Sequence, residues 1–240
     1  MRDNINQTRE AVLQESNTSN RLLILLAGSA AIALGVLFAF VFLPAWGPGL
    51  LSSMAGVAPK AYWYLSRGSG LVAYGLLWFS MALGTLITNK MARLWPGGPA
   101  AFDLHEYASL LGMVFAIFHG LILLGDHFIN FQPVQILLPF STTSYRPLWV
   151  GVGQLAFYLL VIVNLSFYVR KAIGSRTWRT IHYLSYLTFG MALVHGVLSG
   201  SDSSAGWAVW MYWLSAASLL FLLVYRITMH VVPERAKVSA

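Results

Sequence analysis

An apolar stretch from Leu104 to Gly120 carries two histidines, and this combination restricts the chain more than any other feature of its sequence. The stretch is long enough to cross a bilayer as a helix, and ionisable groups at membrane depth are costly, so they mark functional positions. His105 and His119 are 14 residues apart. This is about 21 Å along a helix axis, with the two rings about 40° away from a common face. In a left-handed bundle of roughly 3.5 residues per turn, both rings point the same way.

A second stretch, from Trp178 to Gly196, carries His182 and His195. Two helices with histidines at matching heights predict two stacked hemes, each iron taking one neutral imidazole from each helix. Gly112 lies midway between the first two histidines and leaves bare helix surface where a flat ligand can lie.

The spacing of the second pair fits less well. Thirteen residues separate His182 from His195, which leaves the two rings roughly 100° apart in direction in a left-handed bundle. Either the helix departs locally from regular geometry, or the two rings approach their ligands from different sides of the helix. The residues alone leave both explanations open.

Composition places the chain among polytopic membrane proteins. Of its 240 residues 58% are hydrophobic and 10% are charged, which is far more apolar than a soluble domain. In membrane proteins an excess of Lys and Arg reflects the orientation of the spans in the bilayer. We therefore do not take it as a sign of nucleic-acid binding and expect no nucleic-acid partner. With no cysteine, disulfides, cysteine-ligated iron–sulfur clusters and covalently attached heme are excluded. No nucleotide-binding motif is found, so we expect no flavin or nicotinamide module in the chain.

The expected fold is an all-α membrane protein with six transmembrane helices. A polar tail covers residues 1–20, residues 21–61 hold the first transmembrane helix and an outer loop, residues 62–231 form the heme-binding bundle, and residues 232–240 form a basic tail. The expected spans cover about residues 22–46, 62–88, 102–124, 148–169, 177–198 and 207–229.

Basic residues set the expected orientation of these spans. One set of connections and tails holds Arg2, Arg9, Arg21, Lys90, Arg93, Arg170, Lys171, Arg176, Arg179, Arg235 and Lys237, whereas the other set holds only Lys60 and Arg146. The positive-inside rule therefore predicts that both termini are cytoplasmic. Span order then pairs His105 with His182 toward the cytoplasm, as the inner pair, and His119 with His195 toward the outside, as the outer pair.

These residues resemble the ferric-reductase-like transmembrane domain family. It includes the membrane halves of NADPH oxidases and ferric reductases, and the heme-binding subunit of the periplasmic methionine-sulfoxide reductase system. The resemblance covers about Trp63 to Arg226. It is carried by the run Ser66–Gly70, by the two histidine pairs with their unequal spacings, by Trp178-Arg179, and by His195-Gly196 followed by Gly200-Ser201-Asp202.

The resemblance implies transmembrane electron transfer through two b-type hemes. The donor is expected to be a separate flavin reductase or quinol, and the acceptor a partner redox protein outside the membrane, with the chain in the inner (plasma) membrane of a bacterium. Arg67 is expected to bind the propionates of the outer heme, because a guanidinium fork suits carboxylates. Arg179 is a candidate for the same role at the inner heme, and a positive-inside anchor explains it equally well.

Two other functions stay open at this point. The outer heme could reduce a small acceptor such as ferric chelate or oxygen directly, and whether the chain is itself an enzyme or a redox subunit is undecided. Alternatively, the chain is a non-redox transporter or assembly anchor, in which the buried histidines bind one another or the backbone.

Overall fold

The computed structural model describes Ser52 and residues 61–93, 97–126 and 129–238. The chain divides into two compact units, Met1–Val57 and Ala58–Ala240, and only Ser52 of the first unit is described. The expected polar tail 1–20 and the first expected span, 22–46, lie outside the described residues. The count of six spans and the location of the two termini therefore stay predictions.

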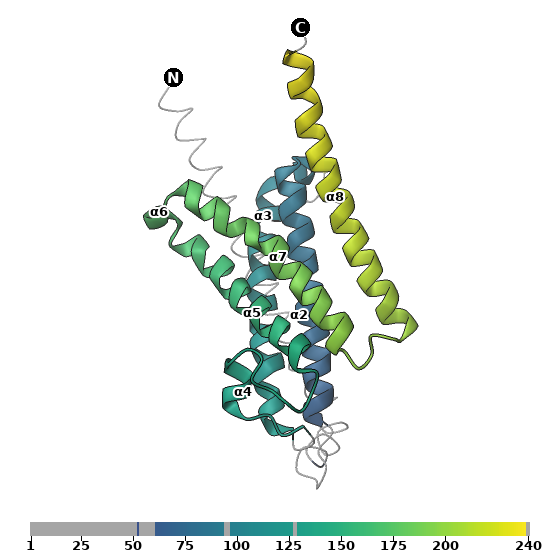
Figure 1. The fold of residues 1–240 in the computed structure, drawn as a ribbon. Coiled ribbons are helices and arrows are strands. Elements are labelled where there is room, and N and C mark those ends of the chain that lie inside the picture. Colours follow the sequence, from purple (N-terminus) through teal and green to yellow (C-terminus); the bar gives the residue numbers. More distant parts are fainter. Residues whose placement is uncertain (1–51, 53–60, 94–96, 127–128, 239–240) are drawn as a thin grey trace, which may run out of the picture. The chain divides into compact units, whose positions relative to one another are not determined.

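Within its described residues, the second unit is built from helices and contains no strand (Figure 1). Its elements are α2 (Ala61–Thr88), the 3-10 helix η1 (Met91–Arg93), α3 (Gly98–Leu121), the 3-10 helix η2 (Ile122–Gly125), α4 (Pro133–Leu137), α5 (Pro147–Tyr168), α6 (Arg170–Ile173), α7 (Ser175–Ser199) and α8 (Gly206–Val238). The all-α fold class is confirmed for this part of the chain.

Among the described residues, five helical segments are long and apolar enough to cross a membrane. These candidate spans are Ala61–Thr88, Gly98–Gly125, Pro147–Tyr168, Ser175–Ser199 and Gly206–Thr228, which agree with the last five expected spans within a few residues. Large apolar side chains such as Val114, Leu165, Leu187 and Phe221 are exposed on these helices. Exposed apolar surface of this extent suits contact with lipid rather than water, and the chain is an integral, multi-pass membrane protein.

Proline and glycine residues determine where several helices begin. Pro99, Pro133 and Pro147 each lie at the first or second helical position, where a missing N–H costs no intrahelical hydrogen bond. Gly174 precedes α7 with a φ of 82°, a conformation that side-chain-bearing residues rarely adopt. The sharp α6–α7 corner therefore follows from local sequence.

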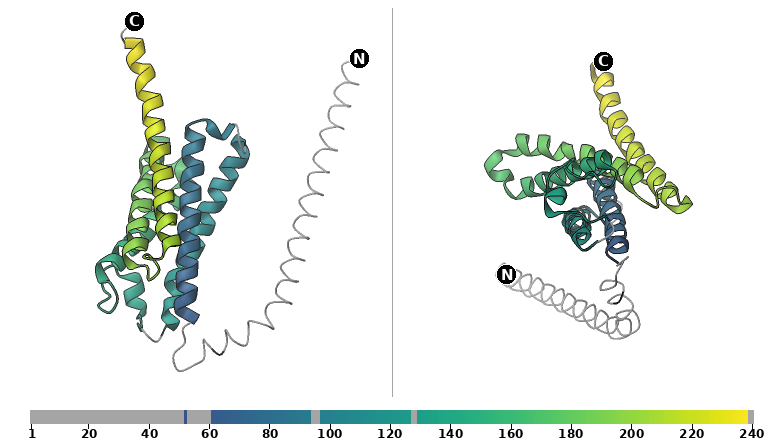
Figure 2. Two further views of the ribbon diagram at one scale, coloured as in Figure 1. Left: turned by 90° about the vertical axis from the view of Figure 1, so that its right-hand side faces the viewer. Right: turned by 60° about the horizontal axis from the view of Figure 1, so that its bottom comes forward.

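The helices form two antiparallel hairpins with a peripheral fifth helix (Figures 1 and 2). Helix α2 packs along α3, and α5 packs along α7, whereas the two hairpins contact each other far less. Helix α8 lies against α2.

Polar contacts join α8 to α2. The Tyr74 hydroxyl lies 2.5 Å from Ser215 Oγ, and the Trp78 indole N–H donates to Ser218 Oγ over 2.9 Å. In lipid such hydrogen bonds act as specific contacts between helices. Helix α8 also continues to Val238, so the basic segment expected to begin as a tail at residue 232 is helical as far as Val238; its Arg and Lys residues are good helix formers.

Gly112 provides a test of the α2–α3 packing. A Cβ atom there would lie 3.3 Å from Leu76 Cβ and 3.6 Å from the Ala73 carbonyl oxygen. Gly112→Val should therefore lower the free energy of unfolding by about 1–3 kcal/mol, the usual cost of overpacking. Tryptophan fluorescence during SDS titration in mixed micelles measures this. Gly75→Val is the matched control, because a Cβ atom at Gly75 meets nothing within 4 Å; equal effects of the two substitutions would contradict the assigned packing.

Candidate functional site

The structure brings the four histidines of the expected spans together as two facing pairs. The ring centroids of His105 and His182 are 6.0 Å apart with an angle of 71° between the ring planes. Those of His119 and His195 are 6.1 Å apart with an angle of 79°. Each pair joins α3 to α7, and therefore joins one hairpin to the other.

Three of the four rings are fixed by the backbone of the adjacent helix. Nδ1 of His105 lies 2.8 Å from the Ser80 carbonyl oxygen, Nδ1 of His119 lies 2.7 Å from that of Ser66, and Nδ1 of His195 lies 2.8 Å from that of Trp149. A carbonyl oxygen only accepts, so Nδ1 must carry the proton in each ring. The remaining nitrogen, Nε2, is then left with a free lone pair, which is the form of histidine that binds a metal.

A glycine one turn further along the helix accompanies each of these three carbonyl groups. In a helix the Cα–Cβ bonds tilt toward the N-terminus, so the side chain at position i+4 covers the carbonyl group at position i. Gly70 follows Ser66, Gly84 follows Ser80 and Gly153 follows Trp149. We call this arrangement of carbonyl, glycine and imidazole the histidine clamp.

Each glycine makes room for the ring that it faces. A Cβ atom at Gly70 would lie 2.8 Å from His119 Nδ1, and one at Gly84 would lie 3.0 Å from His105 Cε1. One at Gly153 would overlap the His195 ring. A larger residue at any of these positions would therefore displace the imidazole from its carbonyl acceptor.

Two serines of α2 add a second contact at the first two clamps. Ser66 Oγ donates to the His119 carbonyl oxygen over 3.0 Å and lies 3.1 Å from Nδ1 of that ring. Ser80 Oγ repeats both contacts with His105, at 3.2 and 3.0 Å. These residues were not recognised as site residues from the sequence. The signal that could have identified them is their spacing, because Ser66 and Ser80, like Gly70 and Gly84, are 14 residues apart, as are the histidines that they face.

His182 is the exception. No hydrogen bond of its ring is found in the described part of the chain, and its ring instead stacks on Trp178 with centroids 5.2 Å apart and an angle of 29°. Helix α7 is continuous between His182 and His195. The 13-residue spacing is therefore accommodated by two rings that leave the helix in different directions, and not by irregular helix geometry.

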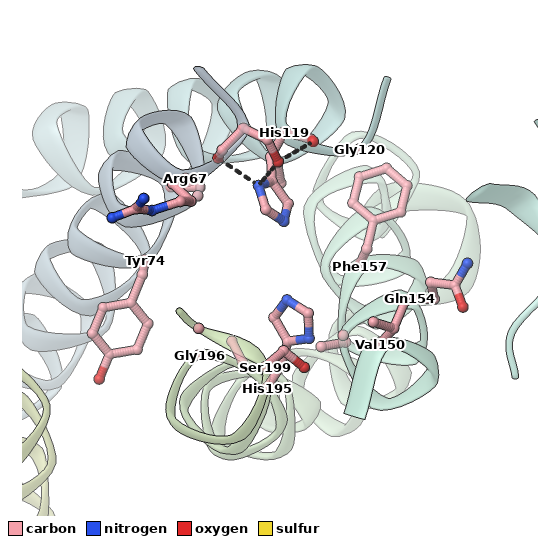
Figure 3. A pocket seen from close by; sticks show the side chains of 18 of the residues that line it. Arg67, Tyr74, His119, Gly120, Val150, Gln154, Phe157, His195, Gly196 and Ser199 are labelled. Atoms are coloured by element: carbon pink, nitrogen blue, oxygen red, sulfur yellow. Dashed lines mark hydrogen bonds between the residues drawn. The ribbon is translucent and has the colours of Figure 1, made fainter. Parts of the chain in front are cut away.

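A mainly apolar cavity of about 480 Å³ lies around the His119–His195 pair. Figure 3 shows the two rings on opposite sides of this space, with Arg67 and Tyr74 along one wall and Gln154 and Phe157 along the other. The volume lies within the range of small-molecule and cofactor sites.

Helix α4 closes one side of this cavity. Gln154 Nε2 donates to the carbonyl oxygens of Gln135 and Ile136 over 2.7 and 2.8 Å, and the Tyr158 hydroxyl donates to that of Leu137. The long apolar connection between the third and fourth expected spans therefore covers the bundle at this level.

The other expected site residues have different surroundings. Arg67 lines the cavity, forms an ion pair with Asp202, and has a buried Nε without a hydrogen-bond partner among the described residues. Arg179 is exposed. Gly112 lines the cavity but packs against α2, so helix packing accounts for it directly. Asp202, in the loop after α7, is the residue that pairs with Arg67.

The geometry of both pairs fits an iron held between two imidazoles. Two metal–nitrogen bonds of about 2 Å each leave the ring centroids roughly 6 Å apart, as observed in both pairs. Among the described residues no group of three or more His, Cys, Asp or Glu side chains gathers to hold a bare metal ion. Each pair could therefore hold a metal whose remaining ligands come from another group, such as a macrocycle.

Comparison with known proteins places the chain in a family. A family profile described as a domain of unknown function (DUF8596) matches residues 61–202, which is more than half of the chain. The chain belongs to this family. The match begins with α2 and ends at Asp202, so it includes all four histidines and both residues of the Arg67–Asp202 ion pair. No curated protein and no solved structure matches the chain.

The serine contacts provide a second test. Ser66→Ala and Ser80→Ala should each lower the free energy of unfolding by roughly 0.5–2 kcal/mol, as expected for hydrogen bonds between membrane helices. Because the two positions lie about 21 Å apart on α2, the double variant should show the sum of the two effects. SDS titration in mixed micelles measures all three variants.

Ser69→Ala is the matched control. Ser69 is also buried on α2, but its hydroxyl donates only to the carbonyl oxygens of Leu65 and Ser66 in its own helix, so the loss should be smaller. A strongly non-additive double variant would show that the two clamps are not independent.

Proposed function

We propose that the protein is a di-heme b-type membrane cytochrome that carries electrons across a membrane. The observation that carries this proposal is the presence of two facing histidine pairs, with ring centroids 6.0 and 6.1 Å apart, on the same two helices. One such pair would suit many buried-histidine networks. Two pairs, 14 residues apart on α3, suit two irons at different depths, and heme iron in these sites would supply a one-electron carrier at each depth.

The tautomers of the histidines support the same conclusion. A backbone carbonyl group accepts from Nδ1 in three of the four rings, which orients the ring and increases the basicity of Nε2. Among the described residues no carboxylate hydrogen-bonds to one of these rings, because Glu106 accepts from the Tyr168 hydroxyl and Asp202 pairs with Arg67. Intramembrane proton relays usually contain carboxylates in contact with the histidines. This difference favours metal ligation over a proton relay.

Aromatic side chains lie between the two pairs along the helices. Phe189 follows His182 by seven residues and precedes His195 by six, and it stacks on Tyr74 of α2 with centroids 5.7 Å apart. Both side chains are buried, so α2 and α7 pack through aromatic rings at a height between the two histidine pairs.

The proposed direction of transfer depends on the expected topology. Lys90, Arg93 and the α6–α7 corner lie at the end of the bundle that holds the His105–His182 pair, and the positive-inside rule places this end in the cytoplasm. We propose six spans with cytoplasmic termini in a bacterial inner membrane, a separate flavin reductase or quinol as donor, and an extracytoplasmic redox protein as acceptor. Membership of the ferric-reductase-like group is part of the proposal.

Arg67 is the proposed partner of the propionates at the outer heme. It lines the cavity beside His119, and its unpartnered Nε is a buried donor. A guanidinium carries five N–H donors, so Arg67 can donate to Asp202 and to a propionate at the same time.

Loss of one histidine tests the assignment. His195→Ala should lose the outer heme and keep the inner one, because His105 and His182 remain in place. Heme and protein quantified on the same detergent-purified sample should give two b hemes per chain for the native protein and one for the variant.

His230→Ala is the control for this experiment, because His230 lies on α8, outside both pairs. Two hemes retained in His195→Ala would contradict the assignment of His195 as a heme ligand. A colourless native protein, produced with ample heme, would overturn the proposed function in favour of a transporter or anchor.

Substitution of the clamp glycines tests the two sites one at a time. Gly70→Val should remove the outer heme by displacing His119, and Gly84→Val should remove the inner heme by displacing His105. Reduced-minus-oxidised spectra and heme content should show about half of the native heme in each variant. Gly68→Val is the matched control on α2, since a Cβ atom there meets nothing within 4 Å. Loss of both hemes, or of neither, would contradict independent clamps.

A further inference from the structure

The two histidine pairs differ in how firmly their rings are held. In the His119–His195 pair both rings donate to backbone carbonyl groups of neighbouring helices. In the His105–His182 pair only His105 does so. Within the described residues, the contacts found for the His182 ring are with the facing His105 ring and with Trp178, one turn earlier on the same helix.

Helix α5 explains why His182 has no clamp. His195 uses the Trp149 carbonyl group, so the corresponding acceptor for His182 lies 13 or 14 residues further along the antiparallel helix, at Ile162 or Val163. The Val163 carbonyl oxygen already accepts a hydrogen bond from Ser166 Oγ over 2.7 Å. One turn after these two positions the chain has Ser166 and Phe167 rather than glycine, so side chains cover the carbonyl groups.

Trp178 takes the place of the clamp. Its indole ring stacks on the imidazole, and Phe167 of α5 packs edge-on against the indole, with ring centroids 6.3 Å apart. The buried indole N–H has no hydrogen-bond partner among the described residues. A stack restrains the plane of a ring but, unlike a hydrogen bond to Nδ1, it does not fix the ring along the direction of its Nε2 lone pair.

We propose that His182 is the exchangeable ligand of the inner site, and that this site therefore binds a small neutral ligand of iron such as carbon monoxide while the outer site does not. Trp178 is the positioning residue that opposes the exchange. With heme bound, the exchange would replace the bond from His182 Nε2 to iron by one bond from the incoming molecule, without transfer of an electron or a proton. This inference rests on the proposed function, since it requires that both pairs hold heme.

The experiment uses the purified full-length chain with both hemes, reduced with dithionite and titrated with carbon monoxide, with the Soret band as the readout. The native protein should bind one carbon monoxide for every two hemes. Trp178→Ala should lower the half-saturating concentration by roughly 2- to 10-fold, the factor that corresponds to the loss of one aromatic stack. Trp178→Phe keeps a stacking ring and should behave like the native protein.

Two double variants identify the reacting site. His119→Ala/His195→Ala retains only the inner pair and should bind carbon monoxide, whereas His105→Ala/His182→Ala retains only the outer pair and should not. Trp207→Ala, which removes an exposed tryptophan of α8, is the control for loss of an indole and should leave the titration unchanged.

The possible outcomes are distinct. Two hemes per chain with no spectral change on adding carbon monoxide would overturn this inference and leave the proposed function standing. Binding by the outer-only variant, or a half-saturating concentration that Trp178→Ala does not change, would also overturn it. A colourless protein would overturn the proposed function and this inference with it.

Discussion

An imidazole N–H inside a membrane needs a hydrogen-bond acceptor, and the rest of this structure depends on where the acceptor is found. Water is absent at that depth and an unpaired polar group is costly. The acceptor used here is the second lone pair of a helix carbonyl group whose first lone pair already serves its own helix. That lone pair becomes accessible where the residue one turn later is glycine, as at Gly70, Gly84 and Gly153.

This local solution determines the architecture around it. A ring that bonds to the backbone of a neighbouring helix must come close to it, so α3 packs along α2, and α7 along α5. The Nε2 atoms then point away from each hairpin and toward the other one. The result is a pair of hairpins that meet through their histidines and leave a cavity between them, while α8 packs against α2 and adds Ala208 and Tyr212 to the lining of that cavity.

Sequence reasoning predicted the parts of this arrangement that depend on hydropathy and on helical period. The five described spans and the pairing of His105 with His182 and of His119 with His195 follow from the apolar runs, the 14-residue spacing and the order of the helices. The supporting residues were missed, because Ser66, Ser80 and the glycines have meaning only once the neighbouring helix is known. The Arg67–Asp202 ion pair was missed for the same reason, since it joins residues 135 positions apart. The 13-residue spacing could not be interpreted, because it depends on what each face of α7 meets.

The clamps also make the distance between the two sites depend on the residue spacing in both α2 and α3. In an antiparallel hairpin, one residue inserted between Gly70 and Ser80 would shift and rotate one carbonyl group relative to its histidine while leaving the other in register. Both clamps are kept only if α3 also gains one residue between His105 and His119. An insertion or deletion in one helix alone therefore cannot change the distance of about 21 Å between the two sites while both clamps are kept. Any relative with a different site-to-site distance would need matched insertions in both helices of the hairpin.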